Sequence, residues 1–369
     1  MGAINKMSFL NDIKSSLSSL VKNKEIITLE EYLELVKKNT KLNRLAHKYV
    51  LDMILSHGVE DNESGSKNYL FFNKQLFGLD ESINNIMSYL KAAASGSEVS
   101  RRILLLFGPT SSGKSQMAIM LKRGLEAYSE TEEGMLYSLS ESPMNENPLC
   151  AIPIKYRDSF EEEYDIAIKG SLSPYMQKLL ESKYDGNFLK MPVTRLYLSE
   201  MNRAGIGTFV PSDKKSQDIS ELIGSLDLSK MAEFWSESDP RAYKVDGELN
   251  ISNRGMMEFV EMLKVDQKFL YVLLTLAQEK NIKTPRFPLI YADEFVLGHT
   301  NETEYRRFLA QEEMEAMHDR LIVVKVPYNL ILDSEIKIYE KLIKESIQVR
   351  GANDNKKHLA PYSLYVAAM

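Results

Sequence analysis

The chain has little of several things that would point to particular classes of protein. It contains one cysteine, Cys150, in 369 residues, which excludes an internal disulfide and makes the reducing cytoplasm the expected location. Its five histidines show no metal-ligand spacing, so a structural zinc site is not expected. No apolar run approaches the roughly 18–20 residues of a membrane span, and the N-terminus lacks the core of a signal peptide. We therefore expect no membrane association.

An excess of positive charge is also missing. Lysine and arginine total 46 against 52 aspartate and glutamate, which gives a net charge of −6. A pI near 5.6 disfavours a general nucleic-acid binder, and we expect no nucleic-acid partner. The content of 44% hydrophobic and 27% charged residues is ordinary for a globular protein, and the length suffices for one large or two to three ordinary domains.

The most informative segment joins an apolar run to a glycine-rich loop. Residues 103–107 read Ile-Leu-Leu-Leu-Phe, which has the length and composition of a buried strand. The phosphate-binding pattern G-x-x-x-x-G-K-S follows, and apolar residues at helical spacing come after it, so strand, loop and helix occur in the order that the motif needs. The expected nucleotide-binding residues of this loop are Gly108, Pro109, Thr110, Ser111, Ser112, Gly113, Lys114, Ser115 and Gln116.

Each residue type in this loop has a chemical reason to be there. Glycines let backbone N–H groups turn toward a phosphate, and the N-terminus of the following helix adds a partial positive charge. The Lys114 ammonium can reach the β- and γ-phosphates, and the Ser115 hydroxyl can ligate Mg²⁺. The segment thus predicts binding of a nucleoside triphosphate, with ATP and Mg²⁺ as the expected cofactors.

Strands alternate with helices downstream of residue 70, and this pattern predicts a parallel α/β sheet with helices on its faces. Besides 103–107, the expected strands are residues 135–139, 195–198, 255–260, 295–299 and 321–326. Residues 140–195 and 201–250 are too long for simple connections and must hold insertions. Within the second of these, residues 205–210 favour a turn, with a loop in which Phe209 grips a polypeptide as the alternative.

Six segments together resemble the PrkA family of bacterial serine protein kinases, specifically its N-terminal AAA+ ATPase region. They are residues 76–80, 108–115, 121–128, 211–218, 253–264 and 299–304. The phosphate loop is shared by many families, whereas 211–218 and 253–264 are far more specific. The resemblance implies an AAA+ P-loop NTPase fold, with a parallel sheet flanked by helices. Family members continue well past this point, so we expect a fragment with an incomplete helical lid.

The resemblance assigns the acidic strand of the ATPase to residues 255–261. Glu261 then polarises the attacking water. The usual metal-side aspartate is replaced by Val260, which cannot coordinate a metal. Glu258 lies on the same face of the strand, about 6.6 Å back at roughly 3.3 Å per residue. Glu258 is therefore the expected second metal residue beside Ser115, acting through a water.

A rival acidic pair is Asp293-Glu294, whose residue types match the usual acidic motif of an ATPase strand better than residues 255–261 do. Chain order argues against it, because little sequence remains downstream for a polar sensor. Under the preferred order, residues 295–299 form the sensor strand and Asn301 stands just past its end.

The resemblance also implies an arginine that acts on a neighbouring subunit and an adenine pocket. Arg320 matches the arginine finger, with an ion pair to Asp319 as the ordinary alternative. The expected catalytic residues are Lys114, Glu261, Asn301 and Arg320. The adenine contacts fall on Phe77, Gly78 and Leu79, for which plain core packing is the alternative.

These inferences predict a helical N-terminal unit over 1–70, an AAA+ core over 71–330 and the start of a lid over 331–369. The predicted function is Mg²⁺-dependent ATP binding and hydrolysis by a homo-oligomeric ring that regulates or remodels a protein partner. Two alternatives stay open: transfer of the γ-phosphate to protein hydroxyls, which the family name suggests, and an ATP-binding scaffold with little turnover, which Val260 suggests. The His-Arg-Asp and Asp-Phe-Gly motifs of protein kinases are absent.

Overall fold

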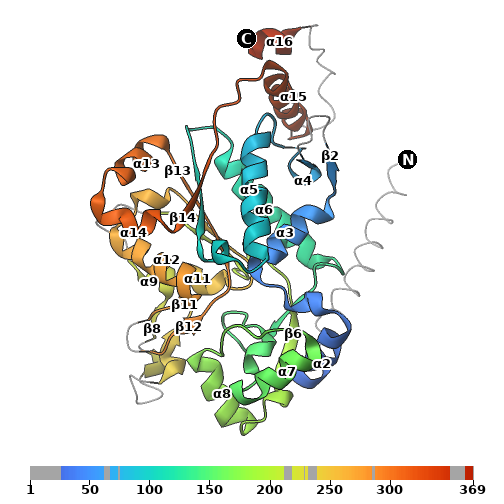
Figure 1. Cartoon of the computed structure of the whole chain (residues 1–369), viewed down its shortest axis with the longest axis vertical. Coiled ribbons are helices and arrows are strands. Elements are labelled where there is room, and N and C mark those ends of the chain that lie inside the picture. Colours follow the sequence, from blue (N-terminus) through green and yellow to red (C-terminus); the bar gives the residue numbers. More distant parts are fainter. Residues whose placement is uncertain are drawn as a thin grey trace.

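The centre of the molecule is a five-stranded sheet in the order β14-β4-β13-β10-β7 (Figure 1). The computed structural model describes residues 26–61, 67–73, 75–211, 218–227, 229–231, 239–284, 287–349 and 362–368. Every neighbouring pair of strands in this sheet is parallel, as predicted. The strands are β4 (Ile103–Phe107), β7 (Ile206–Phe209), β10 (Met256–Phe259), β13 (Phe295–Thr300) and β14 (Leu321–Lys325).

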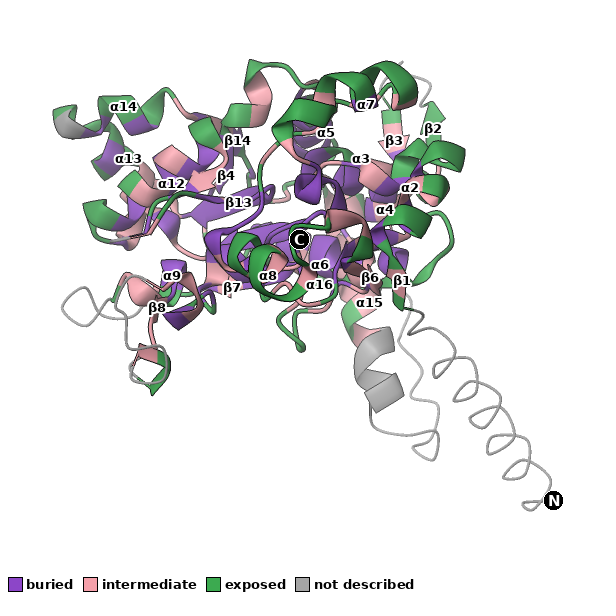
Figure 2. Ribbon diagram, turned by 90° about the horizontal axis from the view of Figure 1, so that it is seen from below, coloured by how far each residue is buried: buried purple, intermediate pink, exposed green. Residues whose placement is uncertain are grey.

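Both faces of the sheet are buried, which explains why its strands are almost continuously apolar. Successive side chains point to opposite faces, so Leu104 and Leu106 join one hydrophobic core while Ile103 and Leu105 join another. The strands accordingly lie in the buried interior of Figure 2. The first core is completed by α3 (Ala46–Ser56), α5 (Asp80–Ala94) and α6 (Lys114–Glu130). The second is completed by α9 (Ser220–Ile223), α11 (Glu248–Ile251), α12 (Gln267–Glu279), α13 (Glu302–Leu309) and α14 (Glu315–His318).

A second sheet, antiparallel and in the order β1-β6-β5, has its own core. It contains two segments that we predicted as strands of the parallel sheet, so that part of the prediction is wrong. They pair instead with each other and with a strand from the N-terminal region, below the main sheet in Figure 1. The elements of this module are β1 (Ile26–Thr28), α2 (Leu29–Lys38), β5 (Leu136–Leu139), α7 (Arg157–Tyr164), α8 (Pro174–Tyr184) and β6 (Pro192–Leu196).

Residues 26–56 contribute to two cores, that of the antiparallel module and that of α5 and α6. Helix α2 begins with a capping box, since Thr28 Oγ1 accepts from the backbone N–H of Glu31 and the Glu31 carboxylate accepts from that of Thr28. Helix α2 packs in the antiparallel module, whereas α3 packs against α5 and α6. The boundary at residue 70 stays a prediction.

Residues 205–210 correct another expectation. They form the edge strand β7, paired in parallel with β10, rather than a turn or an exposed loop. Phe209 is buried and its ring lies 4.7 Å from that of Phe259 and 5.5 Å from that of Phe269, so it cannot grip a polypeptide. The pattern was missed because Gly207 interrupts the short apolar run.

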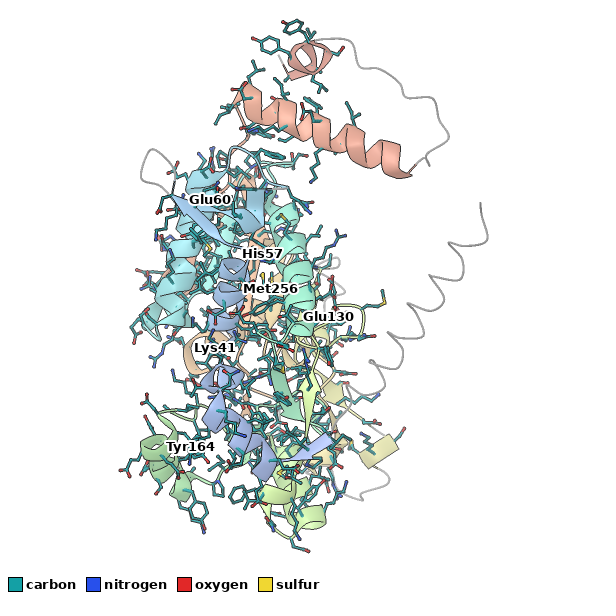
Figure 3. All side chains as sticks on the ribbon, turned by 90° about the vertical axis from the view of Figure 1, so that its right-hand side faces the viewer. Lys41, His57, Glu60, Glu130, Tyr164 and Met256 are labelled. Carbon is teal, nitrogen blue, oxygen red and sulfur yellow. The ribbon has the colours of Figure 1, made fainter. Side chains whose placement is uncertain are left out.

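The remaining elements are short or lie at the periphery. The C-terminal helices lie at the far end of the molecule from Tyr164 of α7, with Met256 of β10 between them (Figure 3). No helix in the described ranges is both long and apolar enough to cross a membrane. These elements are β2 (Val59–Asp61), β3 (Lys67–Tyr69), α4 (Leu70–Asn73), β8 (Ser225–Leu226), β9 (Tyr243–Lys244), β11 (Asn281–Ile282), β12 (Ile290–Tyr291), α15 (Leu332–Val349) and α16 (Ser363–Ala368), with 3₁₀ turns between.

Candidate functional site

The phosphate loop connects the end of β4 to the start of α6. A side chain at Gly108 would place its Cβ only 2.1 Å from the carbonyl oxygen of Val326, so glycine is required there. Gly113 is the N-cap of α6 and has φ of 98°, a conformation that other residues rarely adopt. The sequence therefore fixes a tight loop at the N-terminus of a 17-residue helix, where backbone N–H groups and the helix dipole favour an anion.

Lys114 folds back over this loop. Its ammonium donates hydrogen bonds to the carbonyl oxygens of Gly108 (2.9 Å) and Pro109 (2.5 Å) and to the Ser112 hydroxyl (3.3 Å). Burial lowers the pKa of Lys114, while the negative charge of Glu261 opposes this shift. A cation that holds only neutral acceptors in the loop is available to neutralise phosphate oxygens there.

The predicted adenine segment lies against the loop. A Cβ at Gly113 would contact the side chains of Leu79 (3.3 Å) and Leu76 (3.6 Å). Gly78 has φ of 69° and faces Asn329 in the segment that follows β14. Phe77, Gly78 and Leu79 thus lie between the phosphate loop and the start of the C-terminal helices. In addition, the Gln116 amide donates to the Gln75 side chain, which ties α6 to this segment.

Glu261 and Asn301 meet at the carboxyl edge of the sheet. Glu261 follows β10 in a left-handed conformation (φ 47°), and Asn301 follows β13 as the N-cap of α13. The Asn301 carbonyl oxygen accepts the backbone N–H of Glu304 at 2.9 Å, which leaves its amide to donate to Glu261 Oε2 at 3.3 Å. Lys264 also lies 3.2 Å from that carboxylate oxygen. Parallel neighbouring strands therefore bring together two residues that are 40 positions apart.

Glu258 is engaged by two partners within the protein. Its Oε2 lies 2.7 Å from Lys122 Nζ and its Oε1 lies 3.1 Å from His299 Nε2, and all three side chains are buried. Burial alone would raise the pKa of Glu258, but the hydrogen bonds from His299 and Lys122 outweigh it and hold the pKa below its ordinary value. An ionised carboxylate can only accept hydrogen bonds, so in the bond between Glu258 and His299 the hydrogen lies on His299 Nε2. Direct coordination of Mg²⁺ by Glu258 would require these partners to give way.

Lys122 was missed by the sequence reasoning. It lies two turns into α6. Besides Glu258, its ammonium contacts Glu200 (2.5 Å) and the Thr208 hydroxyl (3.1 Å), near β7. The sequence feature that could have revealed Lys122 is a charged residue on the apolar face of the helix, which also contains Ala118 and Leu125. A lysine on such a face needs a buried anion, which here is Glu258, and His299 is the second partner of that carboxylate.

The rival acidic pair lies at the opposite edge of the sheet. Asp293 and Glu294 precede β13, whereas the phosphate loop follows β4, and these strands are parallel. Asp293 accepts the backbone N–H of Ala46 at 2.7 Å. Burial raises the pKa of Glu294 to about 8, against an opposing hydrogen bond from Ser252. This pair cannot serve a metal at the phosphate loop.

Arg320 also lies away from the loop of its own chain. It directly precedes β14, whose first residue Leu321 pairs with Ile103 at the start of β4. The length of β4, at about 3.3 Å per residue, separates it by roughly 15 Å from the loop. Its guanidinium donates to the Ala316 carbonyl at 2.6 Å, and its Nε has no hydrogen-bond partner in the described structure. Any action of Arg320 on a nucleotide must therefore be on one bound by another copy.

The candidate metal ligands are few. Among the described residues, no three His, Cys, Asp or Glu side chains cluster in a way that could hold a metal ion. Ser115 is exposed at the start of α6 and can contribute its hydroxyl. Mg²⁺ commonly keeps several waters and relies on phosphate oxygens, so Ser115 suits a metal that arrives with a nucleotide.

A parallel sheet with a phosphate loop, a glutamate and an asparagine after three adjacent strands defines an AAA-type P-loop NTPase fold. Residues 27–369 match the sequence profile of the PrkA AAA domain, and the chain belongs to this family.

Relatives with curated descriptions extend beyond this region. The chain is 51% identical over 343 residues to "ATP-dependent protease PrkA" of Bacillus subtilis (strain 168), which covers 93% of this chain and 53% of that protein. It is 37% identical over 282 residues to "Serine/threonine kinase YeaG" of Escherichia coli (strain K12), which covers 74% and 42%. The chain thus spans about half the length of these relatives.

Solved structures with similarity include a complex between subunits BchI and BchD of magnesium chelatase, with a TM-score of 0.42 and 14% identity over 80% of this chain and 69% of that one. Another is NtrX from Brucella abortus, with a TM-score of 0.41 and 11% identity over 81% and 48%.

Proposed function

We propose that this chain binds ATP with Mg²⁺ and hydrolyses it. The observation that carries the proposal is the hydrogen-bonded pair Glu261 and Asn301 at the same edge of the sheet as the phosphate loop. The Glu261 carboxylate can take a proton from a water molecule and the Asn301 amide can orient that water. Both lie at the edge of the sheet that carries the phosphate-binding loop. The names of both relatives imply the use of ATP, as a protease or as a kinase.

Each residue has a role in this mechanism. Backbone N–H groups at the start of α6 hold the β- and γ-phosphates, and Lys114 neutralises their charge. Glu261 takes a proton from the attacking water, while Asn301 orients that water and the carboxylate. The Phe77–Leu79 segment contacts the adenine.

Mg²⁺, when bound, would be held by the Ser115 hydroxyl and would help to neutralise the charge of the phosphates. Glu258 would act on it at most through a water, because Lys122 and His299 engage both of the Glu258 oxygens. Val260 leaves the usual metal-side position without a carboxylate, so the metal would depend on Ser115, on waters and on the phosphate oxygens of the nucleotide.

Turnover also requires a neighbouring copy. Arg320 is too far from its own phosphate loop and would stabilise charge on the γ-phosphate of a nucleotide in an adjacent subunit. We therefore propose a homo-oligomer, arranged as a ring, in which hydrolysis remodels or regulates a protein partner or the rest of the longer protein.

A second candidate function is phosphorylation of serine in a protein. It is favoured by the name of the E. coli relative, and it would use the same loop with a protein hydroxyl in place of water. A third candidate, a scaffold that binds ATP with little turnover, is favoured by Val260.

One experiment separates these functions. The purified chain is incubated with γ-labelled ATP and a candidate protein acceptor, with Lys114→Ala as the control. Label released as free phosphate supports the ATPase, label on protein supports the kinase, and tight binding with neither supports the scaffold. Label that does not depend on Lys114 would contradict all three.

A further inference from the structure

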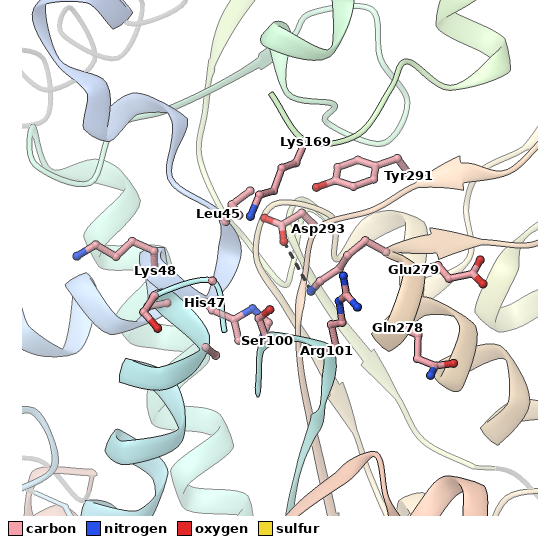
Figure 4. Close-up of a pocket in the computed structure, with 15 residues that line it drawn as sticks. Leu45, His47, Lys48, Ser100, Arg101, Lys169, Gln278, Glu279, Tyr291 and Asp293 are labelled. Carbon is pink, nitrogen blue, oxygen red and sulfur yellow. Dashed lines mark ion pairs between the residues drawn. The ribbon is translucent and has the colours of Figure 1, made fainter. Parts of the chain in front are cut away.

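A cavity of about 430 Å³ lies at the amino edge of the main sheet, the edge opposite the phosphate loop. Its walls come from α3, the end of α5 and the turn after it, the end of α12, and β12. Such a volume is at the lower end of the range for small-molecule sites, roughly 300–1,000 Å³. Figure 4 shows Arg101 and Lys169, from separate segments, among the side chains that line it, and Lys280 lines it as well.

The charges that line this cavity are only partly paired with one another. Arg101, Lys169 and Lys280 line it together with two carboxylates, Glu279 and Asp293, whereas Lys48 extends away from the other labelled cations (Figure 4). Asp293 is already used, because it accepts the Ala46 N–H and lies 3.8 Å from Lys280. Lys48 pairs with Asp52 and Arg101 lies 3.6 Å from Glu98, two carboxylates that do not line the cavity, whereas Lys169 has no ion-pair partner in the described part of the chain. His47 adds no charge, since burial lowers its pKa well below the ordinary value and Lys280 lowers it further.

A buried arginine stands directly behind this cavity. A smaller cavity of about 10 Å³ shares the walls formed by Lys169, Tyr291 and Asp293, and Arg254 lines it together with the buried carboxyl group of Glu146, whose pKa is raised by burial. Arg254 is 3% exposed, and its Nε and Nη2 have no hydrogen-bond partner in the described structure. Leaving buried charged donors unpaired is costly, so an acceptor at this point would be strongly favoured. The space admits about one water-sized group.

The walls are not uniformly polar. Leu45, Ala93 and Ala94 line one side, and the ring of Tyr291 lines another. A bare inorganic anion would not use these surfaces. A ligand with an anionic group and a small organic body would match both the cations and the apolar wall.

We propose that this cavity binds a small organic phosphate, whose phosphate group lies among Arg101, Lys169 and Lys280. One of its oxygens would enter the smaller cavity and accept from Arg254. This site is separate from the ATP site. It lies where β13 begins, whereas Asn301 stands at the far end of the same strand.

Pyridoxal 5′-phosphate is a suitable probe, because it is an organic phosphate whose aldehyde condenses with a nearby lysine amine with loss of water. Borohydride reduces the imine to a stable amine, and mass spectrometry identifies the labelled lysine. The full chain is used with the Lys114→Ala substitution, which removes the reactive lysine of the phosphate loop whether or not that loop binds ATP. Pyridoxal, which lacks the phosphate, is the control for plain amine reactivity.

We expect saturable labelling of Lys169 or Lys280 by pyridoxal 5′-phosphate, at concentrations about tenfold below those that pyridoxal requires. Inorganic pyrophosphate should suppress it. Arg254→Gln should weaken labelling about tenfold, whereas Lys178→Met, on exposed α8, should not. Equal labelling by pyridoxal, or no protection by pyrophosphate, would overturn the proposal. These two comparisons need no change at Arg254 and hold even if that variant fails to fold.

Discussion

Replacing Lys122 with methionine tests the buried ion pair beneath the candidate site. Lys122 Nζ lies 2.7 Å from Glu258 Oε2, and the two side chains are 8% and 6% exposed. Methionine retains an apolar stem but removes the ammonium, which leaves an ionised glutamate in the interior. Removing one partner of a buried pair costs about 3–5 kcal/mol. We expect about 3 kcal/mol, because the hydrogen bond from His299 remains and the other partner of Lys122, Glu200, is 45% exposed.

The matched control is Lys37→Met. Lys37 lies 2.6 Å from Glu163, but the two side chains are 51% and 59% exposed. Exposed pairs contribute about 0–1 kcal/mol, so this variant should unfold close to the wild type. Urea-induced unfolding near neutral pH, followed by circular dichroism, gives the free energy of unfolding of both variants.

The pH dependence gives a second test. The pKa of Glu258 is lowered in the folded state, so its stabilising effect is present above the ordinary value of 4.5 and is lost as the pH falls through the folded value. Once Glu258 is protonated it no longer needs the ammonium, and the cost of Lys122→Met should shrink as the pH drops below 4.5. Adding Glu258→Gln should recover part of the stability. If Lys122→Met costs no more than Lys37→Met near neutral pH, the reasoning is wrong.

Four further predictions follow from particular contacts. Glu261→Gln should retain ATP affinity but lower phosphate release by about 10²–10⁴-fold; loss of binding instead, in an equilibrium titration, would contradict its role with water. Gly108→Ala should abolish nucleotide binding and cost about 1–3 kcal/mol of unfolding free energy, since its Cβ would lie 2.1 Å from the Val326 carbonyl oxygen. Arg320→Ala should lower turnover by about 10³-fold, and mixing it with Lys114→Ala should restore some activity; no recovery in the mixture would argue against action between subunits. The pKa of Glu294 is raised to about 8 in the folded state, so between pH 4.5 and 8 the unfolded chain has lost a proton that the folded chain keeps, and the free energy of unfolding falls as the pH rises through this range. Glu294→Gln should flatten this pH dependence in unfolding measurements. An unchanged pH dependence would show that the carboxyl group is not protonated in the folded state.

Much of the site could be predicted from the sequence because its signals are local. The phosphate loop needs glycines and a lysine at fixed spacing within one strand–loop–helix unit, and residues 103–130 contain all of it. The capping box at Thr28 is likewise decided within four residues. Residues 255–261 were preferred over Asp293-Glu294 as the acidic segment because of the chain order. In the structure, Asp293 and Glu294 lie at the edge of the sheet opposite the phosphate loop.

Other features could not be read from the sequence because they depend on pairing between distant segments. Strand β7 has only four residues and one glycine inside it, and its place at the sheet edge comes from its partner β10. The strands β5 and β6 have the composition of any strand, and only their antiparallel partners separate them from the main sheet.

The sequence by itself determined the phosphate loop, the family and the parallel α/β class, since each depends on short patterns of residue types. Only the tertiary structure decided that Lys122, Glu258 and His299 form one buried network, that Asn301 reaches Glu261, and that Arg254 lies behind a basic cavity. A buried charge is tolerated only next to its partner, and whether two residues become partners depends on which strands and helices pack together.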